Sequence, residues 1–172
     1  MYFVKNFFKE WVVPVLAALI LAFLINKFVF FFISVPTESM YPTIKPGDKI
    51  GVTKVYKKDK LKRGDIVVFY SKELKVMLIK RLIGVPGDKI DVAEDGAVYV
   101  NGEKKSETYV KNPGGKANMS FQVPKDKFLF MGDNRANSLD ARYWNNKYID
   151  KDDIKGKAHF VIFPFSRVGK LK

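Results

Sequence analysis

The sequence contains very few side chains that could activate a nucleophile. Its 172 residues include no cysteine and one histidine, His159, which excludes disulfides, thiolate nucleophiles and metal sites built from several imidazoles. His159 lies in a strand-like run, residues 158–163, where a hydrogen-bonded structural histidine is the more common outcome. A triad built around His159 is therefore disfavoured. A serine paired with a lysine base is the main remaining route to hydrolysis.

Three segments differ from the rest of the sequence in their polar residues, and they cover residues 36–43, 80–88 and 132–142. In the second segment, strand alternation puts Leu78 and Leu82 on the same face as Lys80. A lysine base must be neutral, and burial among apolar groups lowers its pKa from about 10.4. From the residues alone, Lys80 could equally be a charge that protects an edge strand. Ser39, in the first segment, could equally be a turn hydroxyl beside Pro42.

The three segments resemble the signature motifs of the bacterial type I signal peptidases, membrane-bound Ser–Lys endopeptidases that remove signal peptides from exported proteins. The resemblance is carried by Pro-Thr-Glu-Ser-Met at 36–40, Lys-Arg at 80–81 with Gly-x-Pro-Gly-Asp at 84–88, Gly-Asp-Asn-Arg at 132–135 and Ser-x-Asp-x-Arg at 138–142. Residues 63–69 resemble the intervening strand motif. The motifs stand in the family's order. Only about forty residues separate Asp88 from the last motif, which implies a small, Gram-positive-like cap, and the one apolar segment fits the single-anchor members of that type.

The resemblance implies roles for individual residues. Ser39 would be the nucleophile and Lys80 the general base, and the oxyanion hole would combine the Ser39 backbone N–H with the Thr37 hydroxyl. Ser138 would hydrogen-bond Lys80, and Asp140 would pair with Arg142 beneath the site. The implied supporting residues are Gly132, Ser138, Asp140 and Arg142. Ala141 stands where many relatives have serine. No cofactor and no metal are implied.

The resemblance also implies how a substrate would bind. The signal-peptide end would add as a β-strand beside residues 77–83, and it would place Ala-like residues in small apolar pockets. By family position, the pocket walls would be Val35, Met40, Ile44, Leu78 and Ile79.

The sequence after residue 34 is typical of β-structure. Short segments rich in β-branched or aromatic residues alternate with turn signals. The predicted strands cover residues 49–52, 65–69, 76–83, 89–92, 97–100, 127–131 and 158–163. We expect a mainly β fold with a catalytic domain over 28–172, a small cap insertion over about 89–127 and an exposed loop at 112–115. Residues 28–35 are expected to form a strand at the membrane interface, with the end of a longer helix as the alternative.

The N-terminal segment is strongly apolar, because residues 11–25 contain no polar side chain apart from Trp11. This favours a cytoplasmic N-terminus over 1–10, a transmembrane anchor over 11–27 and an extracytoplasmic catalytic domain. As a helix, residues 11–25 reach only about 22 Å of the ~30 Å hydrocarbon core, so residues 2–4, 7–8 and Lys27 would have to extend the span. A cleaved signal peptide is the main alternative, but no small-x-small cleavage site follows.

The formal net charge is +13, and +11 of it belongs to residues 36–172. The lysines are scattered, without a nucleic-acid-binding motif, so we expect no nucleic-acid partner. Anionic membrane lipid is the expected partner besides signal peptides. Two other functions compete. A non-catalytic relative would be expected to lack the serine or the lysine, and a self-cleaving Ser–Lys repressor-type protease would carry a DNA-binding domain in place of the anchor.

Overall fold

The computed structural model of the chain describes residues 7–171, which form two compact units, one ending at Phe31 and one beginning at Phe32. In the first unit, a π-helical turn (η1, Phe8–Val12) leads into helix α2 (Val13–Phe28). Pro14 stands in the first turn of α2, where a missing backbone N–H costs nothing.

Helix α2 coincides closely with the anchor predicted over 11–27, and its large apolar side chains, such as Leu19 and Phe23, are exposed. Within residues 7–171, however, no helix combines the length and the apolar character that a membrane crossing requires. Part of the predicted cytoplasmic N-terminus, including Lys5, and the predicted helix extension at residues 2–4 lie outside the described residues.

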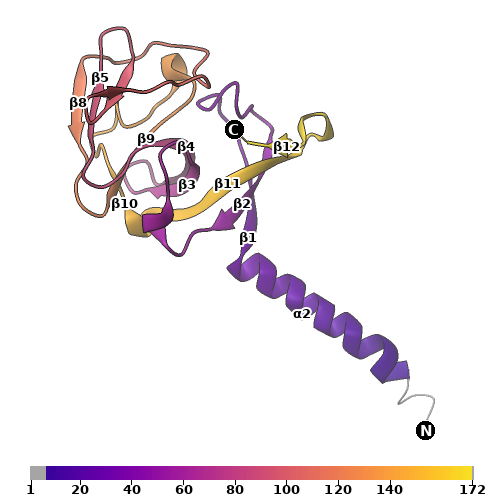
Figure 1. Cartoon of the computed structure of the whole chain (residues 1–172). Helices are drawn as coiled ribbons and strands as arrows, with labels where there is room; N and C mark the ends of the chain where they lie inside the picture. Colours follow the sequence, from indigo (N-terminus) through magenta and orange to yellow (C-terminus); the bar gives the residue numbers. More distant parts are fainter. Residues whose placement is uncertain (1–6, 172) are drawn as a thin grey trace. The chain divides into compact units, whose positions relative to one another are not determined.

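The second unit is built on one large antiparallel sheet (Figure 1). In the described residues its strands follow the order β1-β2-β11-β3-β4-β9-β10, and β12 pairs with β11. Their bounds are β1 (Phe30–Ser34), β2 (Lys49–Lys54), β3 (Ile66–Ser71), β4 (Val76–Gly84), β9 (Lys127–Met131), β10 (Ile149–Asp150), β11 (Ile154–Phe163) and β12 (Gly169–Lys170). Strand β4 pairs with β3 along most of its length but meets β9 only from Arg81 onward.

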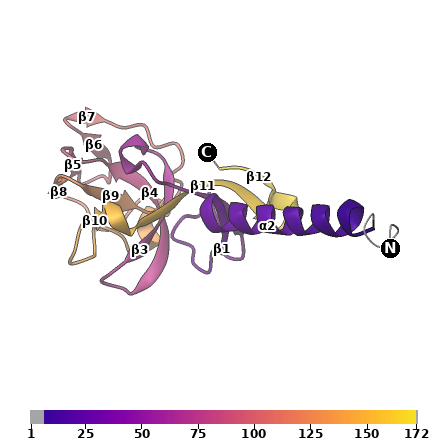
Figure 2. The same cartoon turned by 90° about the horizontal axis from the view of Figure 1, so that it is seen from below.

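A second, smaller sheet lies within the predicted cap insertion, and Figure 2 shows its strands gathered beside β4 and β9. It has the order β7-β6-β5-β8, with bounds β5 (Lys89–Val92), β6 (Val98–Val100), β7 (Glu103–Lys104) and β8 (Met119–Gln122). The two sheets share one hydrophobic core, because Ile90, Val100 and Phe121 of the small sheet belong to the same buried cluster as Phe69 and Phe130 of the large one.

Every predicted strand is confirmed, with bounds that differ by a few residues. Residues 30–34 of the run predicted as a strand over 28–35 form β1, whereas residue 28 is the last of α2. Strands β7, β8, β10 and β12 were not predicted. Three of them, β7, β10 and β12, have only two residues each, too few for period-2 alternation to show. Short 3-10 turns are the other helical segments described after α2, as expected of a mainly β domain.

His159 has the structural role that we expected. It lies in β11, and its Nε2 shares a 2.8 Å hydrogen bond with Thr53 Oγ1 of the neighbouring strand β2. This bond satisfies the ring nitrogen within the sheet.

Candidate active site

Ser39 lies in a loop of consecutive turns directly after β1. The backbone N–H groups of Tyr41 and Ile44 donate to the carbonyls of Glu38 and Met40, at 2.9 Å each. Ser39 is 7% exposed, so its hydroxyl lies at the floor of a depression.

Lys80 reaches this hydroxyl from strand β4 of the large sheet. It lies in β4, opposite Val67 of β3, and is 3% exposed. Its Nζ donates a hydrogen bond to Ser39 Oγ. Burial lowers the pKa of the Lys80 ammonium from 10.5 to about 8, although the negative charges of Asp140 and Asp133 act in the opposite direction. A lysine with this pKa is partly neutral near pH 8 and can accept the serine proton.

Thr37 stands beside the nucleophile. Its Oγ1 lies 3.4 Å from Ser39 Oγ. A hydroxyl at this place can donate to an oxyanion that forms on a carbonyl attacked by Ser39. The structure therefore brings Thr37, Ser39 and Lys80 together.

Gly132 allows the last sequence motif to approach the serine loop. A Cβ at this position would lie 2.2 Å from Ser138 Oγ and 2.3 Å from the Ser39 carbonyl oxygen. Both distances are far inside van der Waals contact, so a side chain would push the two loops apart. The Gly132 N–H donates to Asp140 Oδ2 at 3.0 Å.

Asp140 and Arg142 pair as the resemblance implies. The Asp140 carboxylate accepts from Arg142 Nε and Nη2, each at 2.9 Å, and both side chains are buried. Arg142 also donates to the backbone oxygens of Gly114 and Arg135 at 2.8 Å. The Asp140–Arg142 pair is therefore part of a buried hydrogen-bond network that supports the last sequence motif.

The predicted hydrogen bond between Ser138 and Lys80 is absent. Ser138 is buried, but its Oγ has no hydrogen-bond partner among the described residues. Its hydroxyl lies against the backbone at Gly132, as the close approach above shows. The prediction is corrected in this respect: Ser138 packs beside the site without orienting the lysine.

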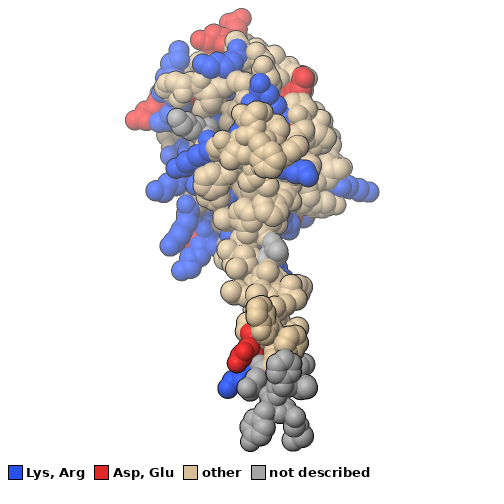
Figure 3. Space-filling model, turned by 90° about the vertical axis from the view of Figure 1, so that its right-hand side faces the viewer, with Lys and Arg blue, Asp and Glu red and all other residues tan. Residues whose placement is uncertain are grey.

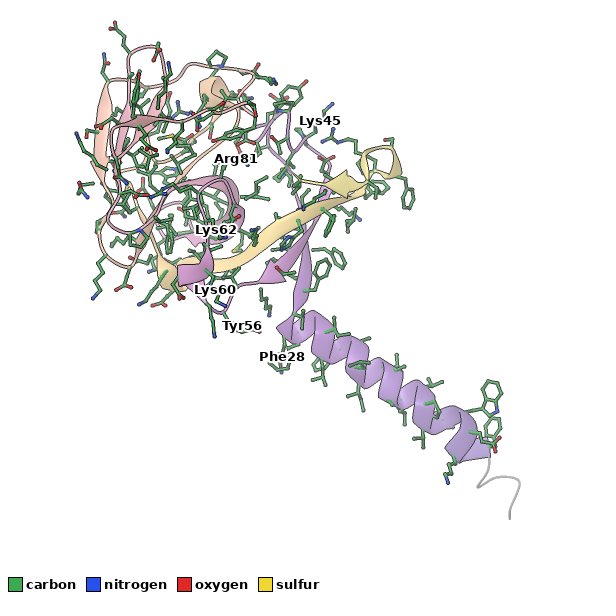
Figure 4. The ribbon with its side chains drawn as sticks, in the orientation of Figure 1. Phe28, Lys45, Tyr56, Lys60, Lys62 and Arg81 are labelled. Carbon is green, nitrogen blue, oxygen red and sulfur yellow. The ribbon has the colours of Figure 1, made fainter. Side chains whose placement is uncertain are left out.

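A second buried ion pair, between Arg81 and Asp133, was not predicted from the sequence. Arg81, which lies inside the domain in Figure 4, donates to Asp133 through Nε at 2.8 Å and Nη2 at 2.6 Å. Asp133 Oδ2 also accepts from Thr43 Oγ1 at 2.5 Å, and the Asn134 N–H donates to the Ser39 carbonyl at 3.1 Å. These bonds hold the serine loop to β4. Both residues belong to the sequence motifs, but no local sequence pattern indicates a contact between residues 52 positions apart.

An apolar hollow of about 310 Å³ opens beside Ser39 and Lys80. Three of the five predicted pocket residues line it, namely Val35, Leu78 and Ile79, and Val76 and Met77 of β4 line it as well. Met40 and Ile44 do not line it. Both are fully buried (0% exposed), so they pack beneath the serine loop, and their assignment as pocket walls is corrected.

The known proteins that resemble this chain in sequence belong to one family. Residues 8–163 match the model of the family described as signal peptidase, peptidase S26. The chain is 40% identical to "Signal peptidase I P" of Bacillus subtilis subsp. natto, with 98% of this chain and 96% of the relative covered. It is 38% identical to "Signal peptidase I T" of Bacillus subtilis strain 168 (97% and 91% covered) and 36% identical to "Signal peptidase IB" of Staphylococcus aureus strain COL (94% and 93% covered).

Among solved structures, the crystal structure of a signal peptidase I from Enterococcus faecalis V583 is 30% identical and aligns with a TM-score of 0.49, covering 57% of this chain and 96% of the other. The family assignment rests on the sequence matches, which span nearly the whole chain. They confirm the resemblance predicted from the motifs: the chain belongs to the signal peptidase family, peptidase S26.

Proposed function

We propose that this protein is a membrane-bound serine endopeptidase that removes N-terminal signal peptides from secreted preproteins and cuts after small residues. The observation that carries the proposal is the hydrogen bond from the buried Lys80 Nζ to Ser39 Oγ. It pairs a nucleophile with a base whose pKa of about 8 suits proton transfer near neutral pH. The family membership gives the substrate class, since the matched relatives are named signal peptidases.

The chemistry proceeds in two halves. Neutral Lys80 removes the proton from Ser39 Oγ, which attacks the scissile carbonyl carbon, and the oxyanion that results is stabilised by the Thr37 hydroxyl and the Ser39 N–H. Protonated Lys80 then gives its proton to the leaving amine, which departs as the new N-terminus. In the second half, Lys80 takes a proton from water, and the hydroxide attacks the acyl-enzyme. Ser39 regains its proton, and the signal peptide leaves with a free carboxylate.

The substrate geometry follows from the open edge of β4. In the described part of the chain, residues 76–80 pair with β3 on one side, and β9 begins to pair only at Arg81. An extended peptide can add to this edge through main-chain hydrogen bonds. The hollow of about 310 Å³ beside it is apolar, which favours apolar side chains, and the preference for alanine-sized ones is inferred from the family.

We also propose that the N-terminal unit attaches the protein to the cell membrane, with the catalytic domain outside. The apolar side chains of α2 are exposed, as is that of Trp11 in the preceding turn. Exposure of so many apolar side chains is favourable only in an apolar surrounding. Lysine and arginine outnumber acidic residues on the face of the domain shown in Figure 3, and they would favour anionic lipid beside it. Retention of the full-length protein in membranes after alkaline extraction tests this attachment, and its release would contradict it.

The decisive experiment uses the full chain in detergent with a labelled preprotein and sequences the new N-terminus. Ser39→Ala and Lys80→Ala should each abolish cleavage while the protein stays folded. Ser166→Ala and Lys125→Ala change exposed residues of the same types, and they should cleave like the wild type. Retained cleavage in either dyad variant, or a cut at an unrelated bond, would refute the proposal.

A further inference from the structure

Three buried arginines lie next to the dyad. Each is 3% exposed or less, and each binds a residue of the last sequence motif. They are Arg81, Arg135 and Arg142. Arg81 binds Asp133, and Arg142 binds Asp140. Arg135 Nε donates to the Gly132 carbonyl at 3.0 Å.

A segment of the cap contacts all three arginines. We define the strap as residues 107–116, which contain no helix or strand. The Glu107 carboxylate accepts from Arg135 Nη1 at 2.7 Å and from Nη2 at 2.6 Å. The Tyr109 ring lies 3.8 Å from the Arg81 guanidinium, and the Gly114 carbonyl accepts from Arg142 at 2.8 Å. Each arginine is thus met by a different group of the strap.

The strap is held tightly along its length. The Ala136 N–H donates to the Asn112 carbonyl at 3.2 Å, and the Lys116 N–H donates to the Tyr143 hydroxyl at 3.0 Å. A Cβ at Gly115 would lie 2.5 Å from both the Arg135 carbonyl oxygen and Arg142 Nη1. The loop expected at 112–115 is exposed in part, but its backbone is packed against the last motif. Such close contact transmits a displacement instead of absorbing it.

Two short paths connect the strap to the reacting atoms. One runs from Glu107 through Arg135 to Gly132, whose Cα lies against the Ser39 carbonyl and Ser138. The other runs from Tyr109 to Arg81, the residue that follows Lys80 in β4. Tyr109 joins the two paths, because its hydroxyl donates to Glu107 Oε1 at 2.6 Å.

The charges of this cluster point to Glu107 in particular. Asp133 compensates Arg81, and Asp140 compensates Arg142. Arg135 pairs with Glu107, with side-chain exposures of 4% and 11%. Removing one partner of such a pair leaves a buried charge uncompensated, which strongly favours rearrangement.

We propose that the strap is a positioning element for the dyad and that Glu107 is its central positioning residue, acting through Arg135 and Gly132 on the contact between Ser39 and Lys80. This inference rests on the proposed peptidase function.

Glu107→Gln tests the inference, since it keeps the side-chain shape and removes the charge. The groups that face Lys80 are Asp140 and Asp133 of the last motif, Ser39 of the serine loop and uncharged Val67 of β3. When the loops loosen, water reaches Lys80 and its pKa rises from about 8 toward 10.5. A rise of about one unit lowers the neutral fraction of Lys80 at pH 7 about tenfold.

For Glu107→Gln we expect kcat at pH 7 to fall about tenfold and the acid limb of the pH profile to move up by about one unit. KM should change less than about twofold, because no strap residue lines the substrate hollow.

The matched control is Glu103→Gln, which neutralises a 79% exposed carboxylate that pairs with Lys105, and it should leave kcat, KM and the acid limb unchanged. Tyr109→Phe is the second variant, and it decides the question if Glu107→Gln fails to fold. It removes the hydrogen bond to Glu107 but keeps the ring over Arg81, so we expect a kcat loss of about threefold with a shift in the same direction.

Two outcomes would overturn the inference: an unmoved acid limb with kcat within twofold of wild type, or a loss of activity that is equal at every pH and follows a lower unfolding temperature. Failure of the wild type to cleave, or cleavage by Ser39→Ala, would contradict the proposed function itself and is visible in the same assay.

Discussion

Replacing Lys80 with methionine should stabilise the fold while it abolishes hydrolysis. Methionine has a similar length and no charge, and it packs well in apolar surroundings. Lys80 is 3% exposed, and burial lowers its pKa to about 8. At pH 7 the folded wild-type protein therefore buries an ammonium group whose proton the unfolded chain would bind more tightly.

The expected magnitude follows from linkage. The Lys80 pKa is about 8 in the folded protein and 10.5 in a solvated lysine, and this difference corresponds to a cost of about 3 kcal/mol when both states are protonated. The variant also loses the hydrogen bond to Ser39, worth about 1 kcal/mol. Lys80→Met should thus raise the free energy of unfolding at pH 7 by about 2 kcal/mol.

The stability difference between Lys80→Met and the wild type should depend on pH. Below pH 8 the cost of burying the ammonium is present in full. As the pH rises from about 8 toward 10.5, the unfolded chain binds more protons than the folded one, so the wild type gains stability relative to the variant. The advantage of Lys80→Met should therefore disappear near pH 10, and at higher pH the wild type should be the more stable protein.

Urea unfolding of the full chain in detergent measures this difference. Trp144 is 2% exposed and packs edge-on against Phe69, with 6.1 Å between ring centroids, so its fluorescence reports on unfolding of the catalytic domain. Lys125→Met, at an exposed site, is the matched control and should show no such pH dependence. The reasoning is refuted when Lys80→Met is no more stable than wild type at pH 7, or when its advantage is the same at pH 7 and pH 10.

Three further predictions concern activity. The kcat/KM of the wild type should rise about tenfold between pH 7 and pH 9, because neutral Lys80 is required and its pKa is about 8; a profile that is flat over this range would exclude Lys80 as the base. Gly132→Ala should lower kcat/KM at least about 100-fold, since the added Cβ would lie 2.2 Å from Ser138 Oγ and 2.3 Å from the Ser39 carbonyl, and wild-type kinetics would contradict the close approach. Thr37→Val should lower kcat about 100-fold with little change in KM; an effect on KM alone would assign the hydroxyl to substrate binding instead of the oxyanion hole.

Much of the fold was predictable from local patterns. The longer strands are rich in β-branched or aromatic residues and lie between turn signals, and all of them were located. The motifs around Ser39 and Lys80 indicated the family, which the sequence comparisons confirm. The residues that line the pocket were harder to predict, because the side chains of a loop of turns do not alternate in direction with a fixed period. Met40 and Ile44 therefore could not be recognised as buried beneath the serine loop.

The amino-acid sequence by itself determined which chemistry was open to this protein. Without cysteine and with a single histidine in a strand, a Ser–Lys pair was the main route to hydrolysis. Only the tertiary structure decided how that pair is held and charged. The Lys80 pKa depends on burial and on Asp133 and Asp140, and those carboxylates, like the strap, reach the site through contacts between residues far apart in the chain. Such contacts follow from packing, which no local spacing of residues encodes.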